Sequence, residues 1–482
     1  MSTLDSDRRR RSIPAITLLM IVIGLLGGAY YLWPLFEREA PQITLTPDSD
    51  ALGLGPVEIA VTDGGVGLKS VTATLSAGGT EHTLASEQYA QPVAEKKIIV
   101  ALSSKLSGLK EGPAVLHVSE GPAVLRISAK DGSWWNSFHG NETVVQKNLT
   151  IDITAPTVEL IADDRYVNFG GVGVVVYKSS ADTKTSGIRI GGYYFPGFQG
   201  QIKEHPDHFV ALFAHPYNVP ADVKAVLVAT DKAGNTREMP LVYELKNVKY
   251  KKSTIALSDN FLQKIAPLLS DVDARQGTPK EIFIRINKGL RKENEDKIVS
   301  ITRRSTPSIL WSGAFSQLSN SKVEANFADE RTYTYDNELI DTAFHLGYDL
   351  SVTKHYPVEA ANSGAVAFAG DLGIYGNAVI LDHGLGLFSL YGHLSSINVK
   401  VGEPIKQRQI VGNTGETGLA AGDHLHYGVY LSGVAVLPVE WWDQKWITDN
   451  IVPKLEGKTG EAIAVSQQQS KAPRKVAHKR RR

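Results

Sequence analysis

The sequence predicts a mainly β protein with an N-terminal transmembrane helix, two immunoglobulin-like β-sandwich modules, a short helical connector and a C-terminal antiparallel β-sheet domain. Two observations lead to this prediction. A long uncharged run follows a cluster of arginines near the start of the chain. Short segments of alternating apolar and polar residues then follow, separated by Gly, Asp and Pro. Such alternation with regular turn signals is typical of antiparallel sandwiches.

The composition describes a folded chain that is not dominated by one sign of charge. Its 482 residues are enough for ~3 domains of about 150 residues each. Lys plus Arg equals Asp plus Glu, 51 each, which argues against a uniformly basic nucleic-acid binder, and we expect no nucleic acid partner. The absence of cysteine excludes disulfides, iron–sulfur clusters and thiol nucleophiles. Any metal would therefore be bound by carboxylates and by some of the 13 histidines.

The N-terminal segment predicts a membrane anchor. Residues 1–12 are basic, and residues 13–36 contain an uncharged run from Ile13 to Trp33 that would span about 30 Å as a helix. Four arginines before this run place the N-terminus in the cytoplasm by the positive-inside rule. We therefore expect a single-pass protein of the inner (cytoplasmic) membrane, with most of the chain periplasmic or extracellular. A signal peptide cleaved near Gly27-Gly28-Ala29 is the alternative, but the length of the run favours an anchor.

Two consecutive segments predict the β modules. Residues 41–155 and 156–250 both contain short alternating stretches, such as Val57 to Val61 and Val223 to Ala229. A similar turn follows a strand in each: Asp131-Gly132 in the first, and Asp231 to Asn235 in the second. Two immunoglobulin-like modules of about 100 residues each would explain this repeat. A β-sandwich adhesin is a possible function, but the modules carry no distinctive set of ligands.

The sequence also predicts a helical connector and a basic C-terminal tail. Within residues 258–305, Ser258-Asp259 can cap one helix, and Thr278-Pro279-Lys280-Glu281 begins a second. We interpret this pair as helices that pack between domains. Residues 465–482 are rich in Lys and Arg and lack an apolar core. Such a tail either contacts anionic envelope polymers or is simply solvated.

The segment 311–447 carries the residues suited to chemistry. His345 and Asp349 form a His-x-x-x-Asp pair, Tyr391-Gly392-His393 follows, and His424-Leu425-His426 comes after a glycine-rich turn. On a strand, residues two or four apart point to the same face, so His424 and His426 would share a cavity, as would His345 and Asp349 if their segment is extended. A catalytic zinc site needs about three protein ligands and one position open for water. Four histidines and one carboxylate leave one or two histidines for proton transfer.

The order and spacing of these motifs resemble the lysostaphin-type (LytM-like) zinc metallopeptidases, which cut peptide bonds in bacterial peptidoglycan. The match also includes Gly376 to Gly384, with the pattern Gly-Asn-x-Val-x-x-x-His-Gly. The resemblance implies a small antiparallel β-sheet domain with Zn²⁺ in a surface groove. It implies that His345, Asp349 and His426 bind the metal and that His393 and His424 are catalytic. The family often has Gly where this chain has Arg408, which affects a surface turn and not the metal.

The remaining histidines are expected to be structural. His383 belongs to the family pattern, but it lies in an Asp-His-Gly turn, for which we favour a structural role. The others lack a partner motif and are expected to be ordinary surface or core residues: His82, His117, His139, His205, His208, His215, His355 and His478.

The sequence thus predicts a membrane-anchored zinc metalloendopeptidase that hydrolyses peptidoglycan peptides by attack of zinc-activated water. The β modules would carry the catalytic domain away from the membrane. The alternative is a latent or non-hydrolytic LytM-like protein that activates cell-wall amidases, in which case an amidase or another envelope protein is a partner. No predicted ligand is missing, which favours the enzyme.

Overall fold

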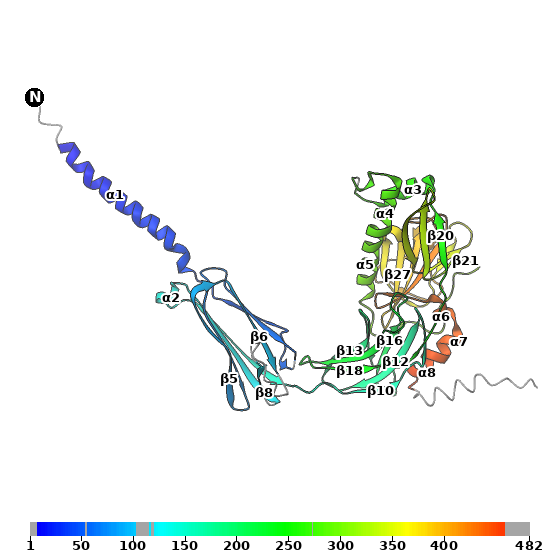
Figure 1. The fold of residues 1–482 in the computed structure, drawn as a ribbon, viewed down its shortest axis with the longest axis horizontal. Coiled ribbons are helices and arrows are strands. Elements are labelled where there is room, and N and C mark those ends of the chain that lie inside the picture. The colour runs from blue at the N-terminus through cyan, green and yellow to red at the C-terminus, as the bar shows by residue number, and fades with distance from the viewer. Residues whose placement is uncertain (1–6, 54, 103–114, 117–119, 272, 458–482) are drawn as a thin grey trace, which may run out of the picture. The chain divides into compact units, whose positions relative to one another are not determined.

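The structure is a computed structural model that describes residues 7–53, 55–102, 115–116, 120–271 and 273–457. The basic tail 465–482, His117 and His478 lie outside these residues. The chain divides into two compact units, Met1–Pro156 with Thr230–Thr236, and Thr157–Ala229 with Arg237–Arg482. Both units are mainly β, as predicted (Figure 1).

The first unit begins with the predicted N-terminal helix. Helix α1 (Asp7–Leu32) continues into the 3₁₀ turn η1 (Trp33–Phe36). Residues Thr17–Phe36 have a mean hydropathy of 1.9 and are long enough to cross a membrane, although a signal sequence would meet the same criteria. The apolar side chains of this segment are exposed, including Leu25 at 68% and Tyr30 at 84%.

Two sheets form the rest of the first unit. One contains β1 (Gln42–Thr46), β3 (Val57–Thr62), β6 (Glu95–Leu102) and β7 (Val115–Leu116). The other contains β2 (Ala51–Leu52), β9 (Glu142–Ile151), β8 (Gly121–Asp131), β4 (Leu68–Ala77) and β5 (Thr80–Val93) in that order, and a short helix α2 (Trp135–Phe138) follows β8. Both sheets contribute to one apolar core, as Ile59, Leu75 and Ile127 illustrate. The alternating apolar residues therefore bury one face of each sheet, but the immunoglobulin-like assignment stays a prediction.

The second unit starts with another set of β-strands. One sheet has the order β10 (Val158–Ala162), β12 (Val172–Ser179), β16 (Phe209–Ala214), β15 (Phe198–Gln199). A second has the order β14 (Tyr193–Pro196), β13 (Thr183–Ile190), β17 (Ala225–Asp231), β18 (Thr236–Pro240). A short parallel pair, β11 (Tyr166–Asn168) and β19 (Glu244–Lys246), accompanies them. Strand β12 is apolar along most of its length and is buried on both faces.

The connector is helical at the predicted capping signals. The Ser258 hydroxyl accepts a hydrogen bond from the Phe261 amide at the start of α3 (Asp259–Ile265). Thr278 and Glu281 form a reciprocal capping box at α4 (Pro279–Ile284). The helix then widens into a π-helical turn, η4 (Arg285–Leu290), and continues as α5 (Arg291–Thr302). Two 3₁₀ turns, η2 (Ala266–Leu268) and η3 (Asp273–Arg275), separate α3 from α4.

The C-terminal domain is built on an eight-stranded antiparallel sheet. Its order is β21 (Lys322–Ala325), β24 (Tyr348–Ser351), β32 (Leu425–Leu431), β28 (Leu387–Leu394), β27 (Asn377–Gly384), β26 (Gly364–Asp371), β30 (Pro404–Ile405), with β33 (Val434–Val436) paired to β32. A three-stranded sheet of β20 (Lys252–Ala256), β22 (Asp329–Tyr335) and β23 (Glu338–His345) supplies one wall of the site described below. A second small sheet joins β25 (Pro357–Glu359), β31 (Ile410–Asn413) and β29 (Ser396–Ile397).

Short helical segments surround this sheet. The 3₁₀ turn η5 (Gly373–Tyr375) precedes β27, and α6 (Pro438–Trp442), α7 (Gln444–Trp446), η6 (Ile447–Ile451) and α8 (Val452–Leu455) follow β33. Arg408, where the family often has glycine, adopts a φ of 66°. The turn therefore uses the left-handed conformation that glycine adopts most easily.

Two buried polar contacts join the second β module to the C-terminal domain. The Glu440 carboxylate in α6 accepts hydrogen bonds from the Asn168 side chain at 2.7 Å and from the Val172 amide at 2.8 Å. The Lys454 ammonium in α8 lies 2.6 Å from the Asp164 carboxylate, and both side chains are buried. Apolar residues from both regions belong to one continuous core. The module and the domain are thus packed as a single body.

Candidate active site

Strand register brings the predicted metal ligands together. Asp349 in β24 lies opposite His426 in β32, and Gly392 in β28 lies on the other side of His426. His345 is the last residue of β23, and a turn at Leu346-Gly347 separates it from β24. His345 and Asp349 therefore approach one another from two strands and not along a single extended segment.

The three candidate ligands form a compact triangle of donor atoms. His345 Nε2 lies 2.9 Å from Asp349 Oδ1 and 3.0 Å from His426 Nδ1, and His426 Nδ1 lies 3.1 Å from Asp349 Oδ1. The two imidazoles are 6% and 3% exposed, respectively. Three ligand atoms this close together in a buried place are suited to one metal ion.

Neighbouring groups hold these ligands in position. His345 Nδ1 donates to the Asn326 carbonyl at 2.9 Å, which leaves Nε2 with its lone pair directed at the site. Asp349 Oδ2 accepts a hydrogen bond from Arg331 Nη2 at 3.0 Å, so that Oδ1 is left for the histidines. Arg331 belongs to β22, outside the motifs that the sequence singled out.

His393 and His424 lie beside this triangle. Their rings are 4.8 Å apart between centroids, and the His393 ring is 5.8 Å from that of His426. His393 Nδ1 donates to the Thr417 carbonyl at 2.8 Å, and His424 Nδ1 donates to the Gly422 carbonyl at 2.8 Å. His424 Nε2 is 3.5 Å from Asp349 Oδ1. Because a carbonyl oxygen only accepts, both neutral rings carry their proton on Nδ1 and leave Nε2 as the basic atom.

Burial and neighbouring charges shift the pKa values of these side chains in different directions. Burial raises the pKa of Asp349, but the surrounding histidines, led by His345, outweigh burial and hold that pKa well below its usual value. Burial lowers the pKa of His426 to about 4 and that of His393 well below the ordinary histidine value. Burial also acts to lower the pKa of His424, but its contact with Asp349 raises the pKa overall. Neutral imidazoles facing a carboxylate are the protonation states that a metal site requires.

A cavity of about 390 Å³ opens onto this cluster. All five predicted site residues line it: His345, Asp349, His393, His424 and His426. Another part of its wall comes from outside the recognised motifs, and includes Leu257 after β20, Phe261 in α3, Phe283 in α4, Arg291 and Arg331. The sequence motifs gave no indication of this wall, because its residues belong to the connector and to strands without a characteristic pattern.

Among the described residues, no other histidine lines this cavity. The His383 ring is fully buried, lies 2.7 Å from both the Ser363 carbonyl and the Ser389 hydroxyl, and packs edge-on against Phe315. His215 lies 2.9 Å from the Tyr243 hydroxyl. His205 and His208 stack on each other in a loop of the second β module.

Two histidines and an aspartate that line one cavity are a donor set suited to a single metal ion. Residues 343–438 match Peptidase family M23. The C-terminal part of the chain is thus an M23 peptidase domain of the lysostaphin (LytM) type, which confirms the resemblance seen in the motifs.

This part of the chain is similar in sequence to two named bacterial endopeptidases. The chain is 38% identical over 95 residues to a DD-carboxypeptidase/endopeptidase, Mpg, of Neisseria meningitidis, a match covering 20% of this chain and 22% of that protein. It is 31% identical over 112 residues to the peptidoglycan DD-endopeptidase ShyA of Vibrio cholerae, covering 23% and 25%. The matched region is therefore about a quarter or less of each relative's length. A crystal structure of an M23 peptidase from Pseudomonas aeruginosa is 20% identical, with a TM-score of 0.36, and covers 57% of this chain and 93% of that one.

The burial of His383 predicts a pH-dependent stability. Burial lowers the pKa of His383 to about 4, whereas an unfolded histidine has a pKa of about 6.5. Between these values the unfolded chain binds more protons, so the free energy of unfolding should fall as pH drops from about 6.5 to about 4, by up to about 3 kcal/mol. Denaturant titrations across this range measure the effect.

The His383→Gln variant should lose this part of the pH dependence, whatever its absolute stability. His355→Gln is the matched control, because the His355 side chain is 67% exposed. An identical pH slope in wild type and His383→Gln would contradict the assignment.

Proposed function

We propose that this protein is a zinc-dependent metalloendopeptidase that hydrolyses peptide bonds in peptidoglycan. The observation that carries the proposal is the buried triangle of His345, Asp349 and His426 at the end of a cavity. The M23 assignment and the DD-endopeptidase relatives support the substrate class. The apolar helix α1 supports a location in the inner membrane, with the bulk of the chain on the periplasmic or outer side.

The donor set fits zinc on structural grounds. Zinc bonds of about 2.0–2.2 Å in a tetrahedral site place neighbouring ligand atoms about 3.3–3.6 Å apart, slightly more than the 2.9–3.1 Å separations of the triangle. His345 already donates through Nδ1 to a backbone carbonyl, as metal-bound histidines usually do. When bound, zinc would act as a Lewis acid toward a peptide carbonyl and would lower the pKa of a water molecule.

His424 and His393 are placed to handle protons and charge beside the ligands. In each ring Nδ1 donates to a backbone carbonyl, so Nε2 is the basic nitrogen. A neutral imidazole in this position can accept a proton from the attacking water, and its protonated form can return a proton to the leaving amine. The contact with Asp349 raises the pKa of His424. His424 is therefore suited to accept the proton from water and to donate it again to the leaving amine. We assign the general base to His424 and oxyanion stabilisation to His393.

The ligand and catalytic roles predict different losses on substitution. His345→Ala and His426→Ala should abolish zinc retention, because each removes one of three protein ligands. His424→Ala should retain zinc but lose about 10²–10⁴-fold in turnover, the usual contribution of a general base. Metal analysis of the purified variants, together with assays on isolated peptidoglycan, measures both quantities. His355→Ala serves as a control that should lose neither. Equal zinc loss in all three site variants would overturn this division of roles.

Arg331 is expected to support the metal through Asp349. Arg331→Met leaves Asp349 Oδ2 without its charged donor and should weaken zinc affinity by about 10–100-fold, as for other groups that orient metal ligands. Arg331→Lys keeps the charge and should recover part of the affinity. Chelator competition measures these values, and an unchanged affinity in Arg331→Met would show that the contact is dispensable.

Zinc bound without peptidoglycan cleavage would instead favour a latent protein or an activator of cell-wall amidases. Adding purified amidases to the same assay separates these two outcomes, because an activator increases amidase product while releasing none itself.

A further inference from the structure

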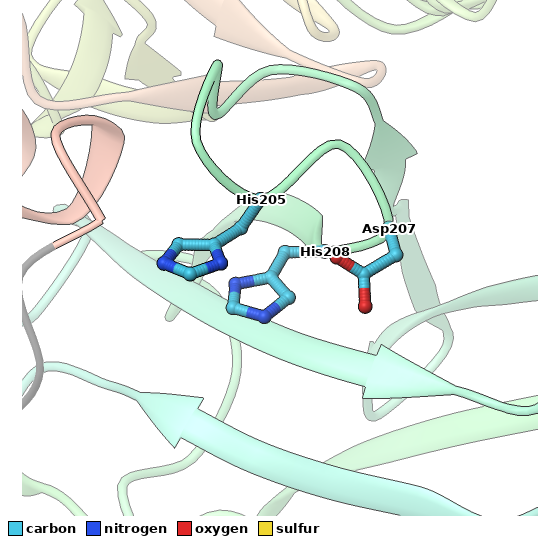
Figure 2. A group of neighbouring side chains, drawn as sticks. All are labelled: His205, Asp207 and His208. Atoms are coloured by element: carbon cyan, nitrogen blue, oxygen red, sulfur yellow. The ribbon is translucent and has the colours of Figure 1, made fainter.

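A second group of metal-binding side chains lies outside the M23 domain. His205, Asp207 and His208 lie in the loop between β15 and β16 of the second β module (Figure 2). One donor atom from each residue lies within 4.8 Å of the others. We propose that this loop binds a second divalent transition metal ion, Zn²⁺, independently of the active site.

His208 is the buried residue of the group. It is only 5% exposed, and in the described part of the chain neither of its ring nitrogens has a hydrogen-bond partner. Leaving a buried polar group without a hydrogen-bond partner costs free energy. Coordination by one ring nitrogen would remove part of this cost.

His205 and Asp207 are the solvent-exposed residues of the group. Both side chains are exposed. The rings of His205 and His208 stack with centroids 4.6 Å apart and an angle of 11° between planes, and Figure 2 shows the Asp207 carboxylate on the other side of His208. Because imidazole lone pairs lie in the ring plane, two parallel rings do not point at one ion. Rotation of the exposed His205 side chain would direct a nitrogen toward the ion and uncover the ring of His208.

The donor chemistry selects the class of metal. Two imidazoles and one carboxylate suit Zn²⁺, whereas Mg²⁺ and Ca²⁺ prefer oxygen donors. This is the same donor set as that of His345, Asp349 and His426. Asp207 Oδ2 lies 3.4 Å from the Lys178 ammonium, so Oδ1 is the oxygen that would meet the metal.

Metal binding here would fix the loop against the end of α8. A Cβ atom added to Gly457, just after α8, would lie 3.2 Å from the His205 ring and 3.3 Å from Ile202. The Gln201 side chain donates to the Pro307 carbonyl at 2.8 Å. The loop therefore contacts two segments of the same compact unit, and an ion held by it would be a structural clamp with no part in peptide hydrolysis.

Zinc stoichiometry of the full-length protein in detergent tests this proposal. After chelation and reconstitution with Zn²⁺ alone, we expect two zinc ions per chain in wild type and one in His205→Ala or Asp207→Asn. Both residues are exposed, so these variants should fold normally. Peptidoglycan hydrolysis, which rests on the proposed function, should be the same in these variants as in wild type. His355→Ala is the matched control and should keep two ions.

Amide hydrogen exchange distinguishes a failure of this site from a failure of the active site. Added Zn²⁺ should slow exchange in residues 200–208 of wild type and of His345→Ala, but not of His205→Ala. Unchanged exchange in the loop of His345→Ala, or an equal zinc count in wild type and His205→Ala, would overturn the proposal. Either result leaves the active-site assignment untouched.

Discussion

The pairing of β24 with β32 is the constraint on which the candidate site depends. It places Asp349 directly opposite His426, while the adjacent β28 brings His393 to the same end of the sheet. A shift of one residue in this register would turn the alternate side chains to the opposite face and separate the donors. The surrounding strands are almost entirely buried, and this burial specifies the register strongly. The polar cluster is thus held by the apolar sheet around it.

Parts of the chain outside the M23 match complete this site. Arg331 in β22 holds the second oxygen of Asp349, and connector residues line part of the same cavity. The second β module is joined to the same body through Glu440, which accepts from Asn168 and Val172, and through the buried ion pair of Lys454 with Asp164. Removing one partner of a buried ion pair typically costs about 3–5 kcal/mol. The module therefore supports the catalytic domain directly, in addition to any role as a spacer.

Local signals predicted local structure well. The caps at Ser258 and Thr278 begin helices where expected, because a hydroxyl that accepts from nearby amides acts within one turn. The His-x-His motif identified two residues that share one cavity, because alternation along a strand fixes the face of each side chain. The His-x-x-x-Asp pair also meets, but through the turn between β23 and β24 and not through strand alternation. Arg331, Glu440 and the cavity wall could not be predicted in this way. Their contacts join residues such as Asn168 and Glu440 that are far apart in the sequence, and no periodic pattern marks such a pair.

The most direct test of the account is to measure zinc content and peptidoglycan cleavage on the same sample of full-length protein. Isolated peptidoglycan would be incubated with the protein, and the released fragments analysed by mass spectrometry. The account predicts bound zinc and new peptide amino termini that disappear with a chelator and return when zinc is restored. Cleavage that persists in a protein fully stripped of metal, or a wild-type protein that does not bind zinc, would contradict it.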